Sequence, residues 1–273
     1  MAISSSRDCP QCGSDHKSKP FALYEDGWHC FSCGSSKRAI RNFQINKLET
    51  VGDITLPELT RNPSMFSLNT LKWLRGYHVT DDLVYKHGIA EAVDHSVITP
   101  VIENERVIMY QQRWCCLSCG GLRCLPTCHD SRRRIMTYGK KVSFIASSSN
   151  NIQILVLVED FISAIRVGEV VDSFCLFGTS LVQGALSKIV QSYDSIVIWT
   201  DGDKSGQTAA EKLKALFNYE INKHLKERSY NYKEKAVFHV ITEKDPKAYT
   251  KSEITNILQT SGVFNEQTSK TSS

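Results

Sequence analysis

Apolar segments alternate with amphipathic ones along residues 151–245. The run Ile152–Val158 is apolar except at Gln153, as expected of a strand that is buried on both faces. Segments with apolar residues at helical spacing then separate three further strand-like runs. These runs are Phe174–Phe177, Ile196–Thr200 and Val237–Ile241. Because strands and helices alternate, the pattern predicts an α/β fold with a mostly parallel sheet.

The preceding region has a different pattern. Helical spacing is found at Leu68–Arg75 and Asp81–His87, and two strand-like runs follow at Val97–Ile102 and Arg106–Arg113. A short turn between the two runs predicts a β-hairpin. We therefore expect a mixed α+β subdomain ahead of the parallel sheet.

Composition shifts divide the chain into five segments. The first contains two cysteine pairs, and the second is polar with Pro57 and Pro63, which is typical of a linker. The expected order is a β-rich metal module, a linker, the mixed subdomain, the parallel-sheet domain, and a C-terminal helix with a flexible tail. The boundaries are 1–42, 43–63, 64–150, 151–250 and 251–273.

Composition limits the class of protein. Of 273 residues, 41% are hydrophobic and 23% charged, which is ordinary for a soluble globular protein. No apolar run approaches the ~18 residues that span a bilayer, and the first residues lack the apolar core of a signal peptide. We expect a cytoplasmic protein with no membrane partner. Ten cysteines in such a protein indicate metal binding rather than disulfides, and a net charge of +4 permits a nucleic-acid partner without requiring one.

The first cysteine cluster has the spacing of a zinc ribbon. Two Cys-x2-Cys pairs are separated by 17 residues, and they comprise Cys9, Cys12, Cys30 and Cys33. Four thiolates at this spacing predict a closed, structural Zn²⁺ site. Trp28 and His29 lie between the pairs and can stack on single-stranded DNA, although Trp28 can equally belong to a small core.

Acidic residues follow two of the predicted buried strands. Glu159 comes directly after the first, and Asp201 and Asp203 follow a later one, within Asp-Gly-Asp-Lys-Ser-Gly. Ligands bind beyond the carboxyl ends of parallel strands, so the three carboxylates should share one crevice. Oxygen ligands of this kind suit Mg²⁺ or Mn²⁺, and such sites act on phosphates. The alternative is that these residues cap helices or face solvent.

A second cysteine cluster and a basic run lie between these regions. Two close pairs can form a second zinc knuckle or remain a redox-sensitive or free cluster, and they are Cys116, Cys119, Cys124 and Cys128. Five cations follow within ten residues, at Arg132, Arg133, Arg134, Lys140 and Lys141. We expect them to contact nucleotide triphosphates or the template backbone, the alternative being a solvated loop.

Taken together, Glu159 and the Asp201–Asp203 motif resemble a TOPRIM domain, which occurs in bacterial-type primases, phage primase–helicases, topoisomerases and some nucleases. The order of a ribbon, a spacer and then a TOPRIM domain resembles that of the primases. In its small size the chain most resembles a stand-alone phage primase. The segment ending in Arg113 resembles the primase Gly-x-x-Arg or Gln-x-x-Arg segment, and Lys244–Lys247 resembles the family's Asp-Pro-Asp or Asp-Pro-Lys.

This resemblance implies an RNA polymerase that makes primers on single-stranded DNA from ribonucleoside triphosphates. Glu159, Asp201 and Asp203 would hold the catalytic metals, and Arg113 would contact phosphates or template. Asp245 and Lys247 would lie at the rim of the same site and contact nucleotide or template. The resemblance also implies a replicative helicase as a partner.

The first TOPRIM motif departs from the family pattern. It often reads Glu-Gly-x-x-Asp, whereas this chain has Glu159-Asp160-Phe161-Ile162-Ser163. The second acid is therefore replaced by Ser163, and we expect Asp160 to cap the following helix. This departure leaves the number of metal ions open.

Three other functions share parts of this pattern. A TOPRIM nuclease would use the same carboxylates to cut DNA, but the ribbon and the Arg113 segment argue against it. A recombination mediator with zinc and TOPRIM modules would need helix-hairpin-helix repeats before Cys9. A topoisomerase would need a large additional domain with a nucleophilic tyrosine.

Overall fold

The structure is a computed structural model. It describes residues 54–114, 135–148, 153–227 and 235–264, together with five short strands before residue 54. The chain divides into two units, Met1–Lys140 and Lys141–Ser273, each of which is described by itself. The division falls N-terminal to the expected boundary at residue 150, because β11 (Phe144–Ala146) pairs with β13 (Asp172–Cys175) of the second unit.

The strands of the first unit form two sheets, which are antiparallel except for one parallel pair. The N-terminal sheet has the order β1 (Ser4–Ser6), β2 (Phe21–Tyr24), β3 (Gly27–Cys30) and β4 (Ser36–Arg38), as expected of a β-rich module. The second sheet has the order β10-β9-β8-β7-β6, and β5 (Glu49–Thr50) pairs in parallel with β9 off this path. Its other strands are β6 (Leu59–Thr60), β7 (Ala90–Ala92), β8 (Val97–Glu103), β9 (Arg106–Arg113) and β10 (Ile135–Tyr138).

The predicted hairpin and the two predicted helices of this region are confirmed. β8 and β9 pair antiparallel across Asn104 and Glu105, which both have positive φ, as the tightest hairpin turns require. The helices are α1 (Leu68–Gly76) and α2 (Asp81–His87), preceded by the short helix η1 (Pro63–Met65). Ser67 and Thr80 cap α1 and α2 by accepting main-chain N–H groups.

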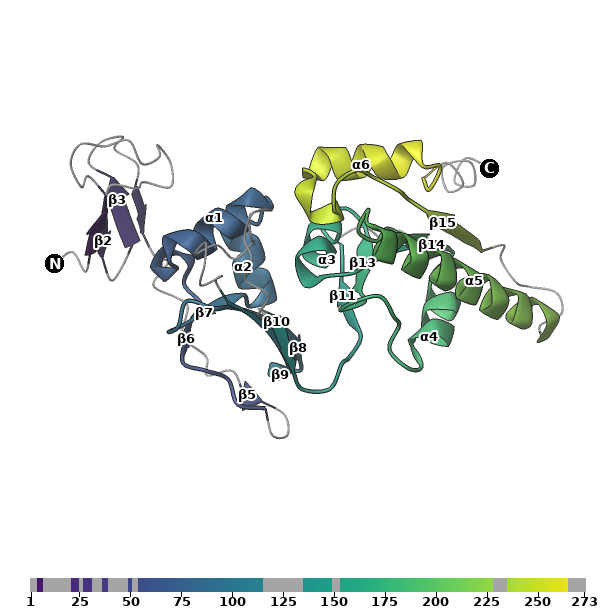
Figure 1. Cartoon of the computed structure of the whole chain (residues 1–273), viewed down its shortest axis with the longest axis horizontal. Coiled ribbons are helices and arrows are strands. Elements are labelled where there is room, and N and C mark those ends of the chain that lie inside the picture. Colours follow the sequence, from purple (N-terminus) through teal and green to yellow (C-terminus); the bar gives the residue numbers. More distant parts are fainter. Residues whose placement is uncertain are drawn as a thin grey trace. The chain divides into compact units, whose positions relative to one another are not determined.

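The second unit has a five-stranded sheet of order β11-β13-β12-β14-β15, with four parallel strands and the antiparallel edge strand β11 (Figure 1). The parallel strands are β12 (Ile154–Val158), β13, β14 (Ser195–Ile198) and β15 (Ala236–His239). The helices are α3 (Phe161–Val167), α4 (Ala185–Ser192), α5 (Lys204–Glu227) and α6 (Lys251–Thr260), with the short helix η2 (Pro246–Ala248) before α6. The predicted α/β fold with a mostly parallel sheet is confirmed, and the sequence did not predict β11.

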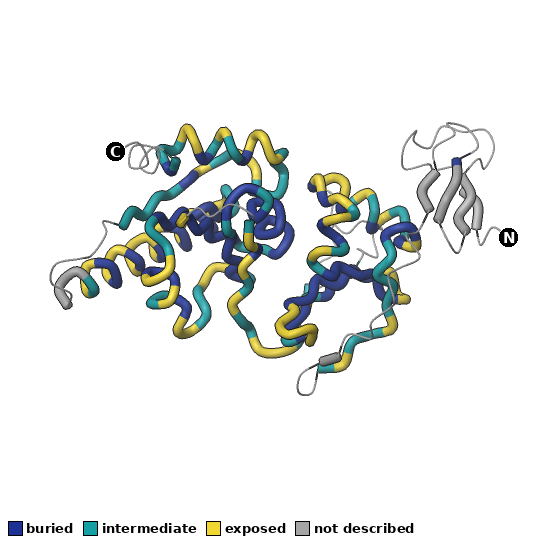
Figure 2. The backbone as a smooth tube through the Cα atoms, turned by 180° about the vertical axis from the view of Figure 1, so that it is seen from behind, coloured by how far each residue is buried: buried dark blue, intermediate teal, exposed yellow. Residues whose placement is uncertain are grey.

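The core of the second unit explains the apolar runs. All five residues of β12 are fully buried, because helices cover both faces of the sheet. Figure 2 shows the buried stretches of the backbone in dark blue. Leu155 and Leu157 pack with Ile189 of α4 and Phe217 of α5, while the alternating Val156 and Val158 point to the opposite face. Strands in this position hold the residues that follow them in fixed places.

Within the described ranges, no helix is long and apolar enough to cross a bilayer.

Candidate functional site

Glu159 and Asp201 follow two neighbouring parallel strands. β12 pairs with β14, with Leu157 opposite Ile198, so the chain leaves both strands at the same edge of the sheet. Oε1 of Glu159 accepts the main-chain N–H of Asp201 at 3.1 Å. The ends of the two strands are therefore joined by a hydrogen bond from one acidic residue to the backbone of the other.

Asp203 lies at the start of α5 and holds the helix N-terminus. Its Oδ1 accepts the main-chain N–H of Gly206 at 2.7 Å, and the side chain is exposed. This contact has the form of a helix cap, which was the alternative considered for this residue. A carboxylate can keep such a bond through one oxygen and bind an ion through the other.

Two glycines allow the chain to close around these acids. A Cβ at Gly206 would lie 2.2 Å from the carbonyl oxygen of Asp201 and 2.7 Å from Oε1 of Glu159. A Cβ at Gly202 would lie 2.7 Å from the carbonyl oxygen of Thr242. Glycine is required at both positions by close approach of other groups. The spacing Asp-Gly-Asp-x-x-Gly signals this need for Gly206, although sequence reasoning assigned that residue no role.

Burial and mutual repulsion raise the pKa values of two of the acids. Burial and the charge of Asp201 raise the pKa of Glu159 to about 7, from an ordinary 4.5, although the hydrogen bond from the Asp201 backbone opposes the shift. Burial, with the charges of Asp245 and other acids, raises the pKa of Asp201 to about 6, and the charge of Lys247 opposes this. A bound cation would relieve both effects.

The described residues fit a divalent cation. Oδ1 of Asp201 is buried and has no hydrogen-bond partner within the described part of the chain. The carboxylate oxygens of Glu159, Asp201 and Asp203 are of the kind that Mg²⁺ or Mn²⁺ prefers as ligands. Over the same described residues, no three His, Cys, Asp or Glu side chains lie close enough to hold one ion together. Completing such a site therefore requires the Asp203 side chain to turn, which its exposed position permits.

Lys247 binds two carboxylates at the same edge of the sheet. Its Nζ donates to Oδ2 of Asp160 at 2.9 Å and lies 3.0 Å from Oδ2 of Asp245. Asp160 caps α3, as expected, by accepting the N–H groups of Ile162 and Ser163. The ammonium of Lys247 therefore contacts two protein carboxylates, and its contact with nucleotide or template stays a prediction.

The structure also describes three of the predicted basic residues, Arg113, Lys140 and Lys141. Arg113 ends β9 in the first unit, with its guanidinium 5.3 Å from the centroid of the Trp73 ring. Lys140 is exposed. Nζ of Lys141, in the second unit, donates to the carbonyl oxygen of Ser180 at 2.9 Å, in the segment between β13 and α4.

Several predicted residues lie outside the described residues. Cys30 is buried at the end of β3, while the side chains of Trp28 and His29 on the same strand are not described. The others outside the described ranges are Cys9, Cys12, Cys33, Cys116, Cys119, Cys124, Cys128, Arg132, Arg133 and Arg134. The zinc ribbon and the second zinc knuckle therefore stay predictions.

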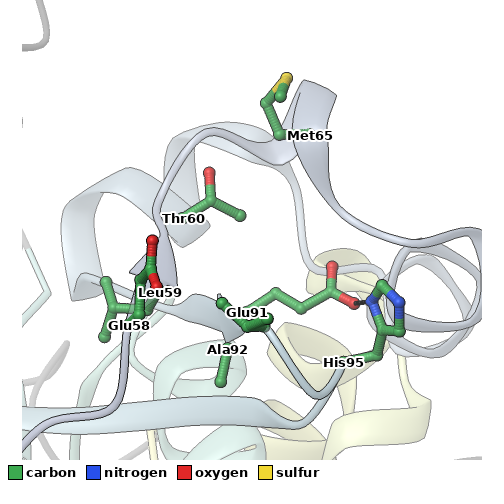
Figure 3. A pocket seen from close by; sticks show the side chains of 8 residues that line it. Glu58, Leu59, Thr60, Met65, Glu91, Ala92 and His95 are labelled. Carbon is green, nitrogen blue, oxygen red and sulfur yellow. Dashed lines mark hydrogen bonds and ion pairs between the residues drawn. The ribbon is translucent and has the colours of Figure 1, made fainter. Parts of the chain in front are cut away.

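A hollow of about 230 Å³ lies in the first unit, and the residues that line it are not among the predicted site residues (Figure 3). Glu91 and His95 point toward one another at its wall, with Oε1 3.0 Å from Nδ1. Oε2 of Glu91 accepts the N–H of Ser67, which precedes α1, at 2.5 Å. Because both oxygens of this buried carboxylate are engaged, we assign the pair a structural role in attaching α1 to β7.

The family comparison agrees with this geometry. Residues 157–249 match the model of a family described as Toprim-like, and the matched segment runs from β12 to the residue after η2. The second unit therefore carries a Toprim-like domain. A comparison with curated proteins finds no match.

Several solved structures are similar in outline. The primase fragment of the bacteriophage T7 primase-helicase protein is 15% identical, with a TM-score of 0.44, and the match covers 96% of this chain and 100% of that one. The zinc-binding and RNA polymerase domains of the Aquifex aeolicus primase are 14% identical, with a TM-score of 0.44 and coverage of 93% and 77%. The DnaG catalytic core is 12% identical, with a TM-score of 0.49 and coverage of 74% and 77%. The assignment of the second unit as Toprim-like comes from the family match over residues 157–249 and not from these structures.

Proposed function

We propose that the chain is a DNA primase that synthesises short RNA primers on single-stranded DNA by metal-dependent nucleotidyl transfer. The observation that carries the proposal is the pairing of Glu159 with Asp201 at the ends of adjacent strands of a Toprim-like domain. Both carboxyl groups have raised pKa values, so the cluster favours a cation.

The acidic residues hold and orient the reacting groups. Glu159, Asp201 and Asp203 would bind Mg²⁺ or Mn²⁺, which when bound supplies positive charge to phosphate oxygens and lowers the pKa of a hydroxyl group. The bond from the Asp201 main-chain N–H holds the Glu159 carboxylate in place before substrate binds, so this side chain needs little reorganisation during reaction.

Basic residues would neutralise the substrates. Arg113 and the cations at 132–134, 140 and 141 would bind the triphosphates of ribonucleotides or the backbone of the template. The ribbon, with Trp28 and His29, would bind a short template sequence by stacking. The resemblance to primases adds a replicative helicase as partner and a cytoplasmic location to the proposal.

Primer synthesis tests this proposal. The zinc-loaded protein is incubated with Mg²⁺ or Mn²⁺, γ-labelled ATP, the other ribonucleotides and mixed-sequence single-stranded DNA. Short labelled products that are destroyed by ribonuclease and require the template are the expected result. Metal-dependent shortening of the DNA without such products would overturn the proposal in favour of a nuclease.

A further inference from the structure

The carboxylate of Asp160 is fully used by the protein. Oδ1 accepts the main-chain N–H groups of Ile162 and Ser163 at 3.0 and 3.1 Å. Oδ2 accepts the hydroxyl of Ser163 at 2.7 Å and the ammonium of Lys247 at 2.9 Å. A carboxylate has about four acceptor positions, so Asp160 can offer an oxygen to a metal ion only by giving up one of these four bonds.

Lys247 is fixed between two segments of the second unit. Asp160 begins α3, and Asp245 precedes η2, where Pro246 occupies the first helical position. The Lys247 side chain is only 13% exposed, so its ammonium has exchanged most of its water for these carboxylates. Burial lowers its pKa, but the charges of Asp160, Asp201 and Asp245 outweigh this and raise it, so the amine stays protonated.

The charge of Lys247 also acts on Asp201. It is the largest effect that lowers the pKa of that acid, against burial and the neighbouring acids. The cluster of five acids is thereby divided in two. Lys247 forms ion pairs with Asp160 and Asp245 and offsets one of their two negative charges. The three carboxylates that it does not contact, at Glu159, Asp201 and Asp203, are left for an added ion.

We propose that the Lys247 ammonium is a built-in cation of this site, so that the acidic cluster binds one divalent ion rather than two. The inference deepens the proposed function, on which it rests for the identity of the site. Lys247 is a positioning residue: it orients Asp160 and Asp245 and limits the negative charge around Asp201.

Counting bound Mn²⁺ tests the inference without any measurement of activity. The zinc-loaded full chain is titrated with Mn²⁺ by calorimetry and by the electron paramagnetic resonance signal of free Mn²⁺. The wild type should bind one ion that Asp201→Asn abolishes. Lys247→Arg should still bind one, and Lys247→Asp should bind two. Circular dichroism verifies that each variant is folded.

Lys247→Met provides a second readout. Removing the charge without adding a ligand should keep one ion but bind it on the order of tenfold more tightly, because a positive charge near the site repels the ion. Two ions in the wild type that are both lost in Asp201→Asn, or unchanged Mn²⁺ binding in both Lys247→Asp and Lys247→Met, would overturn the inference. Absence of primer synthesis with the predicted ion counts would instead overturn the proposed function and leave this inference standing.

Discussion

Oε1 of Glu159 accepts the main-chain N–H of Asp201 at 3.1 Å. This bond makes the position of one acidic residue depend on the backbone that carries the other. Neighbouring buried strands supply both residues, so the core of the domain fixes the site. The same closeness puts two negative charges together, and this has measurable consequences.

Asp201→Asn should stabilise the protein in the absence of metal while removing its response to metal. Neutralising Asp201 removes its repulsion of Glu159. It also removes the negative charge from Oδ1, a buried atom that has no hydrogen-bond partner within the described residues. Because the site is partly exposed, the gain should be no more than ~1 kcal/mol, a rise in Tm of about 2–4 °C for a protein of this size. Thermal melting with and without Mg²⁺ measures both effects. A lower Tm without metal, in a correctly folded variant, would contradict this account of the site.

The stability of the metal-free protein should fall as pH rises from about 4 to 7. Glu159 and Asp201 have folded pKa values of about 7 and about 6, above their ordinary values of 4.5 and 3.8. In this window the folded state binds more protons than the unfolded state, so raising the pH favours unfolding. Melting across the window, compared with the double variant Glu159→Gln/Asp201→Asn, isolates the contribution. An identical pH profile in the double variant would refute it.

Mg²⁺ binding should strengthen over the upper part of the same window. Protons compete with the ion for the two carboxylates, so affinity should rise until pH passes about 7 and then level off. Calorimetric titration at several pH values measures the change, together with the number of protons released. Affinity that is constant from pH 5 to 8 would show that these groups are not the ligands.

Gly206→Ala should disrupt the site. The new Cβ would lie 2.2 Å from the Asp201 carbonyl oxygen, which is backbone shortly after the end of β14, and 2.7 Å from Oε1 of Glu159, whose side chain would have to leave its bond to the Asp201 N–H. We expect a loss of at least ~2 kcal/mol in unfolding free energy and of metal-dependent stabilisation. Ser205→Ala, at an exposed neighbouring position of α5, is the matched control and should change little. Chemical denaturation of the two variants tests this, and equal stabilities would contradict it.

Asp160→Ala should cost more stability than Asp160→Asn. Alanine removes the cap of α3, worth about 1 kcal/mol, and leaves the buried ammonium of Lys247 with one carboxylate fewer. Asparagine keeps the cap and loses only the charge. Urea denaturation gives the difference between the two variants. If both cost the same, the cap contributes nothing.

Local signals in the sequence predicted much of the second unit. The apolar run Ile152–Val158 indicated a strand buried on both faces, and β12 at Ile154–Val158 is such a strand. The acid after it was therefore expected at the carboxyl edge of the sheet. The edge strand β11 gave no such signal, because Phe144–Ala146 is three residues long and its pairing with β13 depends on a distant segment.

Contacts between distant segments were the part of the site that sequence could not supply. Gly202 makes room for the Thr242 carbonyl, a contact between segments 40 residues apart that no local pattern indicates. Similarly, the partners of Lys247 lie on α3 and before η2, and no spacing rule connects positions 160 and 247. The role of Arg113 in catalysis stays a prediction, since it belongs to the first unit.

The most direct test of the central claim is template-dependent RNA synthesis by three proteins in one series. They are the wild type, Asp201→Asn, and Glu211→Gln as a control on an exposed position of α5. We predict short RNA products from the wild type and from Glu211→Gln, and a reduction of at least about a hundredfold in Asp201→Asn. Equal product from Asp201→Asn and the wild type, with all three proteins folded, would contradict the claim that the carboxylates of Glu159 and Asp201 are required for the reaction.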